Sequence, residues 1–321
     1  RLMKNIDSTS HLKGESIYLD DIPVIGGTLF CAVYDSPIAH GKITSLDISA
    51  AEQSEGVVRI FTHKDIKGEN QIGGIILDEP LLAEDEVDFC GMPIVLVVAD
   101  TTEHAKEACK KIICEIEPLP VITDPREAKE KGKLITQPRH FKIGEPENAW
   151  QHCTHIFEGK ADSNGQEHLY IETQGAYSVP LENGSIKIYS STQGPTAVQR
   201  ITARVLGLAM HQIEVDVTRL GGGFGGKEDQ ATTWAIMCAL ATQHLKKPVK
   251  YSLDRMDDMR MTGKRHPYSS DFKIGLDKDL KIIAYEATFY QNAGAAADLS
   301  PAVMERTLFH STNSYYIPNA K

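Results

Sequence analysis

"RLGGGFGGKEDQ" (residues 219–230) places five glycines in six consecutive positions, directly before a lysine and an acid. Two phosphate-loop patterns nearly fit this stretch. Gly221, Gly223 and Gly226 match G-x-G-x-x-G, but the G-x-x-x-x-G-K pattern ends on Glu228, where a P-loop needs Ser or Thr for magnesium. A carboxylate at that place would repel a nucleotide phosphate. We therefore expect the loop to enclose a ligand, but not in the manner of an ATPase.

The residues on either side predict that this loop joins a strand (213–220) to a helix (229–245). Backbone N–H groups near a helix N-terminus favour anions, and glycine allows the backbone to approach a ligand closely. Phe224 is then expected on an exposed loop, where a large aromatic ring favours stacking. A dinucleotide site also needs an acid about 20 residues further on, and "LATQHLK" has none. An NAD-binding dehydrogenase is therefore the weakest interpretation.

Length and composition indicate a globular protein of about two domains, since the 321 residues are 41% hydrophobic and 24% charged. The formal net charge of −10 gives no sign of the basic face that a nucleic-acid-binding protein would need. No apolar run approaches the length of about 18 residues that spans a bilayer, and the N-terminus shows no signal peptide. We expect a cytoplasmic location, with neither nucleic acid nor membrane as partner.

Cysteine spacing indicates no metal or redox site. The six cysteines are Cys31, Cys90, Cys109, Cys114, Cys153 and Cys238. The close pair at 109 and 114 matches no zinc or redox spacing, and no iron–sulfur pattern is present. We interpret them as reduced core cysteines of a cytosolic protein and expect any electron relay to lie elsewhere.

The predicted fold class is α/β (α+β), in two domains joined by a linker. Residues 1–122 alternate strands with a helix at 101–112, for which Thr102 is the expected N-cap. Residues 123–145 are charged, contain two prolines and read as a linker. Residues 146–321 form a second α/β unit. It contains a hairpin over 182–184, a helix that starts at Pro195 and ends near Gly207, and a hairpin around 277–279.

Three further places carry candidate functional side chains. Gln193 ends a strand in "SSTQGP" and, taken alone, reads as a helix-terminus amide. Arg306 lies among apolar residues, as a surface arginine on a helix commonly does. Glu167, His168 and Glu172 offer metal-ligand chemistry without the rest of a metal site. A structural polar cluster is the favoured interpretation, and we assign no metal-ligating residue.

Taken in order, several stretches resemble the xanthine oxidase/aldehyde oxidase family. "GQEHLYIET", "SSTQ", "RLGGGFGGKE", "YSLDRMDDMRMTGKRHP" and "DLSPAVMERTLFHSTNSYYIPN" resemble its molybdenum-binding portion. The earlier "GESIYLDDIP", "SPIAHGKI" and "DEPLLAEDEVDFCGMPIVLVVADT" resemble its α/β hammerhead domain. The resemblance covers nearly the whole chain. It implies an N-terminal α/β hammerhead domain (1–122), followed by the first part of a molybdenum cofactor-binding domain (146–321).

The resemblance implies roles for five residues. Gln193 would hydrogen-bond an oxo ligand of the molybdenum centre, Phe224 and Gly225 would approach the metal and its pterin, and Glu228 and Arg306 would bind substrate. A carboxylate at one end and a guanidinium at the other can orient a planar purine and stabilise charge developing on its ring. An aldehyde needs neither group. A purine hydroxylase is therefore favoured over a relative acting on an aldehyde or another N-heterocycle, and over a non-catalytic assembly module.

The implied reaction is oxidation of hypoxanthine and xanthine to urate, with water as the oxygen source and a molybdenum–pterin cofactor carrying the redox step. Electrons would leave through two [2Fe-2S] clusters to FAD and then NAD⁺, held on partner chains or further segments of a dimeric assembly. The resemblance stops at Lys321, whereas the family's molybdenum portion continues and there supplies the glutamate general base. We expect the chain without that C-terminal remainder to be inactive and to bind the cofactor poorly.

Overall fold

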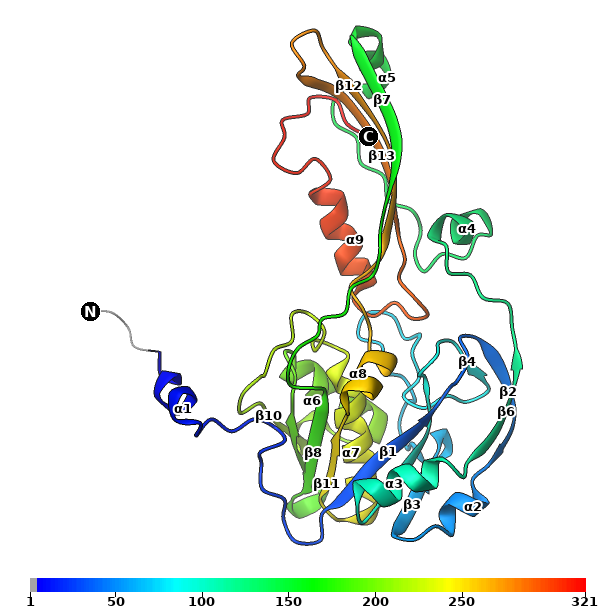
Figure 1. Ribbon diagram of the computed structural model, residues 1–321, viewed down its shortest axis with the longest axis vertical. Coiled ribbons are helices and arrows are strands. Elements are labelled where there is room, and N and C mark those ends of the chain that lie inside the picture. Colours follow the sequence, from blue (N-terminus) through cyan, green and yellow to red (C-terminus); the bar gives the residue numbers. More distant parts are fainter. Residues whose placement is uncertain (1–4) are drawn as a thin grey trace. The chain divides into compact units, whose positions relative to one another are not determined.

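The computed structural model describes residues 5–321, which divide into two compact units (Figure 1). Unit 1 contains the described residues up to Pro120 together with His168–Gly263, and unit 2 contains Val121–Glu167 and Lys264–Lys321. Each unit is thus built from two separate segments of the chain. The sequence-based division around 123–145 follows the chain in order and stays a prediction.

A seven-stranded sheet forms the centre of unit 1 (Figure 1). Its strands, in order across the sheet, are β10 (Ile213–Asp216), β9 (Ile186–Ser190), β8 (Gly175–Pro180), β11 (Val249–Ser252), β1 (Leu29–Asp35), β5 (Pro93–Ala99) and β3 (Val57–Phe61). β1 pairs in parallel with β11, where Leu29 lies opposite Val249, and antiparallel with β5, where Phe30 lies opposite Ala99. β1 therefore joins strands from the early part of the chain to strands from its later part.

The sheet separates two hydrophobic cores. Every residue of β5, "PIVLVVA", is buried, as expected for an apolar strand covered on both faces. Leu96 and Val98 belong to one core, whereas Val95 and Val97 belong to the other, because successive side chains of a strand point to opposite faces. The strand predicted from "MPIVLVVAD" is confirmed.

Six α-helices are described in unit 1. They are α1 (Ser8–Lys13), α2 (Ser49–Glu52), α3 (Thr102–Cys109), α6 (Pro195–Leu206), α7 (Ala231–Leu245) and α8 (Arg255–Met261). α6 begins at Pro195 and is followed by Gly207 at a left-handed φ of 66°, as predicted. The expected cap of α3 is wrong by one residue, because the Thr101 side chain accepts the His104 N–H and Thr102 is already helical.

α7 is the central helix of the larger core. It packs against α6 and against β8, β9 and β11, and each of its residues from Ala231 to Gln243 is buried. A helix surrounded by the core can be apolar on every side. Its one indole N–H, on Trp234, donates to Oε1 of Gln174 at 3.0 Å, so the buried polar atom is satisfied.

The remaining strands form two smaller sheets. In unit 1 the order is β4 (Glu86–Val87), β2 (Gly41–Asp47) and β6 (Ile113–Pro118); in unit 2 it is β13 (Ile282–Gln291), β12 (Tyr268–Leu276) and β7 (His155–Ser163). Unit 2 also contains α4 (Pro125–Glu130), α5 (Pro146–Ala149) and α9 (Ser300–Phe309). The predicted hairpin of β12 and β13 is confirmed, and Oδ1 of Asp277 accepts the N–H groups of Asp279 and Lys281 in its turn.

These mixed helices and sheets confirm the α/β (α+β) prediction. Within residues 5–321, no helix has both the length and the apolar character needed to cross a membrane. Cys31 and Cys238 are buried free thiols, as expected, but Cys90 is exposed, so the core interpretation is wrong for that cysteine.

We expect the larger core to dominate the stability of unit 1. Ile236→Ala in α7, at a side chain that is 0% exposed, should lower the free energy of unfolding by about 2–5 kcal/mol because it leaves a cavity. Ile6→Ala, at a side chain that is 95% exposed, is the matched control and should change it by less than about 0.5 kcal/mol. Denaturant titrations of both variants make the comparison, and equal effects would contradict the assigned core.

Candidate functional site

The glycine loop (residues 219–230) lies between β10 and α7, as the sequence predicts. Gly222 and Gly225 have φ values of 96° and 92°, which favour glycine strongly. Phe224, between them, is also left-handed, with φ of 52°, and its side chain is 75% exposed. A bulky residue held in this conformation and facing solvent costs free energy, and such costs concentrate at functional loops. The expectation of an exposed Phe224 is confirmed.

Gln193 holds the tip of the loop through its side-chain amide. Oε1 of Gln193 accepts the backbone N–H groups of Gly225 at 3.0 Å and Lys227 at 3.2 Å. The backbone N–H of Gln193 donates in turn to the Lys227 carbonyl at 2.8 Å. A Cβ on Gly223 would lie 2.4 Å from Oε1, so only glycine fits there. The helix-terminus interpretation of this side chain is wrong, because it braces the loop and does not cap α6.

These hydrogen bonds also settle which way the Gln193 amide points. Two backbone N–H donors require the carbonyl oxygen at their end, so the amide nitrogen Nε2 lies at the other end. Nε2 donates to no other residue in the described part of the chain, and the side chain is exposed. It is therefore available as a hydrogen-bond donor to a ligand.

A buried ammonium group lies beneath the loop. Lys227 is 0% exposed, and its Nζ donates to the Glu172 carbonyl and to Oγ of Ser191, both at 2.7 Å. Nζ also lies 3.5 Å from Oε2 of Glu172 and 4.4 Å from the ring centroid of Tyr170. Burial lowers the pKa of Lys227, while the Glu172 carboxylate opposes this shift.

The Glu172 carboxylate ties this ammonium to the start of the loop. Oε2 of Glu172 accepts the N–H of Gly221 and the hydroxyl of Ser191, both at 2.7 Å. A Cβ on Gly221 would lie 2.4 Å from Cβ of Glu172, so the carboxylate reaches the backbone only because this residue is glycine. Glu172 thus supports the loop, in agreement with the structural interpretation of its cluster.

A second buried network supports the end of the glycine run. Nε2 of Gln174 donates to the carbonyl of Gly226 and to the hydroxyl of Tyr170, both at 2.9 Å. Asp258 accepts the Tyr170 hydroxyl at 2.8 Å and the Gln174 N–H at 2.6 Å. Sequence reasoning missed Lys227, Gln174 and Asp258 as supports. Only Lys227 carried a sequence signal, because it directly follows the glycines.

The outward side of the loop carries the predicted substrate acid. Glu228 is exposed and lies before α7, which begins at Ala231, so it is not in the first turn of the helix. A Cβ on Gly194 would lie 2.9 Å from the Glu228 carbonyl oxygen, which places this backbone beside the Gln193 segment. The structure therefore brings Gln193, Phe224, Gly225 and Glu228 together.

The loop is poorly suited to a phosphate. The N–H groups of Gly221, Gly225 and Lys227 already donate to Glu172 or Gln193, so they are not free to form the expected anion-binding concavity. Its outer face instead offers the Gln193 amide and the bare backbone of Gly225, where an added Cβ would meet no atom within 4 Å. Open space beside an amide donor and an exposed aromatic ring fits a bulky, oxygen-rich group such as a metal–pterin cofactor.

Arg306 is the one predicted site residue outside this group. It lies on α9 in unit 2, is exposed, and donates from Nη1 to the Ala302 carbonyl of its own helix at 3.4 Å. Glu228 belongs to unit 1, so the pairing of these two side chains around one substrate stays a prediction. A cavity of about 730 Å³ within unit 2, between the segment 122–141, β13 and α9, is lined by none of the predicted site residues.

We expect Lys227 to be essential to the folded loop. Lys227→Met should lower the free energy of unfolding by about 3–5 kcal/mol, because it strands the largely buried Glu172 carboxylate. The double variant Lys227→Met/Glu172→Gln should recover part of this loss, because the stranded charge is gone. Lys110→Met removes an exposed ion pair with Glu107 and should cost less than about 0.5 kcal/mol.

Denaturant titrations of the unaltered protein and of the three variants measure these changes in the free energy of unfolding. If Lys227→Met were no less stable than Lys110→Met, the buried ammonium would not support the loop.

Comparison with known proteins places this arrangement in a family. Residues 127–321 match the family model of the molybdopterin cofactor-binding domain, and residues 13–120 match that of the aldehyde oxidase and xanthine dehydrogenase a/b hammerhead domain. The chain is 38% identical to xanthine dehydrogenase of Emericella nidulans over 98% of its length, and 39% identical to xanthine dehydrogenase/oxidase of Gallus gallus over 99%. It spans 23% and 24% of the lengths of those two relatives.

A solved structure shows the same fold. The aldehyde oxidoreductase of Desulfovibrio gigas matches with a TM-score of 0.87 at 24% identity, over 98% of this chain and 37% of that chain. The predicted hammerhead and molybdenum cofactor-binding folds and the predicted resemblance are confirmed. The chain belongs to the aldehyde oxidase and xanthine dehydrogenase family, with an α/β hammerhead domain followed by a molybdopterin cofactor-binding domain.

Proposed function

We propose that this chain is part of a molybdenum hydroxylase of the xanthine dehydrogenase type, which oxidises hypoxanthine and xanthine to urate with water as the oxygen source. The observation that carries the proposal is the braced glycine loop, which turns Phe224, Glu228 and the Gln193 amide nitrogen outward. The two xanthine dehydrogenase relatives, similar over nearly the whole chain, support it.

The cofactor side of the loop is formed by Gln193, Phe224 and Gly225. The molybdenum–pterin cofactor, when bound, supplies the two-electron redox chemistry. Nε2 of Gln193 donates a hydrogen bond toward it, and Oε1 holds that amide in place through the N–H groups of Gly225 and Lys227. Gly225 lets the backbone approach without a side chain, and the Phe224 ring excludes water from the contact.

The substrate side is formed by Glu228. Its carboxylate makes no ion pair with any residue from 5 to 321, so its acceptor oxygens are available to N–H groups on the rim of a purine. Arg306 is the second substrate group and binds the opposite, electron-rich edge of the ring. The pair orients the planar substrate and stabilises charge that develops on it. Glu228 binds the substrate, and we do not assign it the role of general base.

The reaction requires an outlet for two electrons. Within residues 5–321, no group of cysteines approaches an iron–sulfur ligand set, and Cys31 and Cys238 are buried. We therefore assign two [2Fe-2S] clusters, FAD and the step to NAD⁺ to other domains or subunits of a dimeric, cytoplasmic assembly. The long relatives, of which this chain spans about a quarter, support the existence of such further parts.

The substrate class is tested on the complete native complex. Its rate of dye reduction with hypoxanthine and xanthine is compared with that on an aromatic aldehyde. A clear purine preference is expected, whereas an aldehyde preference would contradict the substrate assignment and leave the family unchanged. A complex that contains no molybdenum and oxidises neither substrate would contradict the catalytic proposal and favour an assembly module.

Glu228 gives a sharper prediction in the same complex. Glu228→Gln should lower kcat/KM for hypoxanthine roughly 10- to 100-fold, because a charge-assisted hydrogen bond to the substrate is lost. The value for an aromatic aldehyde should change less than about twofold, since an aldehyde has no ring N–H groups to bind. Glu182→Gln, at an exposed glutamate in the β8–β9 turn, is the control and should change neither.

The two substrates separate a binding role from a structural one. An equal loss on both would show that Glu228 maintains the loop and does not select the purine. No loss on either would remove Glu228 from the site.

A further inference from the structure

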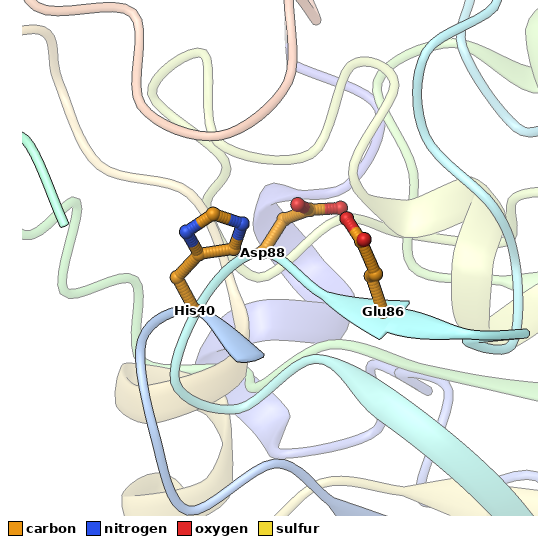
Figure 2. A group of neighbouring side chains, drawn as sticks. All are labelled: His40, Glu86 and Asp88. Carbon is orange, nitrogen blue, oxygen red and sulfur yellow. The ribbon is translucent and has the colours of Figure 1, made fainter. Parts of the chain in front are cut away.

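Three potential metal ligands lie on one face of the small sheet in unit 1. β2 and β4 are antiparallel, with Gly41 opposite Val87 and Lys42 opposite Glu86. The same register continued by one residue places His40 opposite Asp88. Side chains two residues apart on a strand, and those directly opposite each other, share a face. His40, Glu86 and Asp88 therefore converge, and their ligand atoms lie within 4.8 Å of one another (Figure 2).

The histidine is already oriented as a metal ligand would be. Nδ1 of His40 lies 2.8 Å from the carbonyl oxygen of Pro120. A carbonyl only accepts, so Nδ1 carries a proton, and whenever the ring is neutral Nε2 is left with the lone pair that a metal needs. Figure 2 shows one ring nitrogen facing the two carboxylates and the other turned away from them. A backbone carbonyl that binds the remote N–H of a histidine is the usual outer partner of a metal-bound imidazole.

The backbone holds this histidine from a second side. The N–H of Leu119 donates to the His40 carbonyl at 3.0 Å, so the residue is fixed between β2 and the segment that follows β6. The hydrogen-bonded ring therefore belongs to a defined local structure and is not a freely rotating surface side chain.

The charges of the cluster favour a cation. Glu86 and Asp88 are two carboxylates on one face, and their negative charges attract a cation to the side chain of His40 beside them. Lys42, which the register places opposite Glu86, is exposed and forms no ion pair with any described residue. Both carboxylates are exposed, so a hydrated ion can reach them directly.

We propose that Nε2 of His40 and the carboxylates of Glu86 and Asp88 bind a divalent transition-metal ion of the zinc class. One imidazole with two carboxylates suits Zn²⁺, whereas Mg²⁺ and Ca²⁺ prefer ligand sets made of oxygen alone. Metal–ligand distances of about 2.1 Å place tetrahedral ligand atoms about 3.4 Å apart. The present ligand atoms lie within 4.8 Å of one another, and rotation of the exposed Glu86 and Asp88 side chains brings them to the shorter separation. Water takes the fourth position.

The site has a structural consequence within unit 1. Pro120, the carbonyl partner of His40, is the last residue of the first segment of that unit, before the chain passes to unit 2 at Val121. A metal on His40 fixes this end of the segment to β4 through Glu86 and Asp88. The ion stabilises the small sheet and takes no part in the proposed hydroxylation, so the two proposals are tested separately.

Zinc binding to the purified 321-residue chain tests the proposal. Cys90→Ser is the common background, because this exposed thiol lies two residues after Asp88 and could bind zinc itself. Isothermal titration with ZnCl₂ should show one ion per chain, weakened more than about tenfold by each of His40→Gln, Glu86→Gln and Asp88→Asn. Asp85→Asn is the control, because it removes the same charge from a neighbouring exposed residue on the other face of the strand. This variant should bind zinc as tightly as the background protein does.

Two further readouts distinguish a built site from general attraction. Cobalt substitution should give the visible absorption bands of a low-symmetry site in the background protein but not in His40→Gln, and ZnCl₂ should raise the Tm of the former only. Circular dichroism of each variant verifies its fold. Equal zinc affinity in the background and in His40→Gln would overturn the proposal, as would a site that binds Ca²⁺ or Mg²⁺ in preference to Zn²⁺.

Discussion

The glycine loop depends on one buried ammonium group. Nζ of Lys227 has no access to water, so its charge has to be compensated by the protein. The Glu172 carbonyl and the Ser191 hydroxyl accept hydrogen bonds from this ammonium, and the Glu172 carboxylate supplies opposite charge nearby. The same carboxylate accepts the N–H of Gly221. The inner side of the loop is thereby committed to structure, which leaves the outer side to carry function.

This constraint explains why the loop contains so many glycines. Gly221 and Gly223 give the side chains of Glu172 and Gln193 room to reach the backbone, and Gly222 and Gly225 take left-handed conformations. A purely sequence-based view attributes all of them to close approach of a ligand. In the structure, most of these glycines allow side chains and backbone of the same chain to pack closely around the loop. Gly225 alone among them faces open space.

Local signals in the sequence predicted much of the fold. The Pro195 and Gly207 boundaries of α6, the hairpin at Asp277 and the buried strand β5 all rest on short-range chemistry. The interleaved units could not be predicted in this way, because the pairing of β1 with β11 joins residues more than two hundred positions apart. No periodicity or turn signal records such a pairing.

The candidate site likewise contains one feature that the sequence predicted and others that only the three-dimensional structure shows. The exposed position of Phe224 follows from its place on a glycine-rich loop, and the sequence predicted it. The bracing role of Gln193 needs three-dimensional contact with Gly225 and Lys227, so the isolated side chain read as a helix terminus. The His40 cluster is likewise assembled by strand register, which is why spacing along the chain gave no hint of a metal.

The central claim is that one face of this loop holds a molybdenum–pterin cofactor while Glu228 holds a purine. The most direct measurement is an experimental structure of the complete native complex with hypoxanthine bound. Nε2 of Gln193 should face the metal centre, and the carboxylate of Glu228 and the guanidinium of Arg306 should each lie about 3 Å from the purine. A purine bound away from Glu228, or a cofactor bound away from Gln193 and Gly225, would contradict the account.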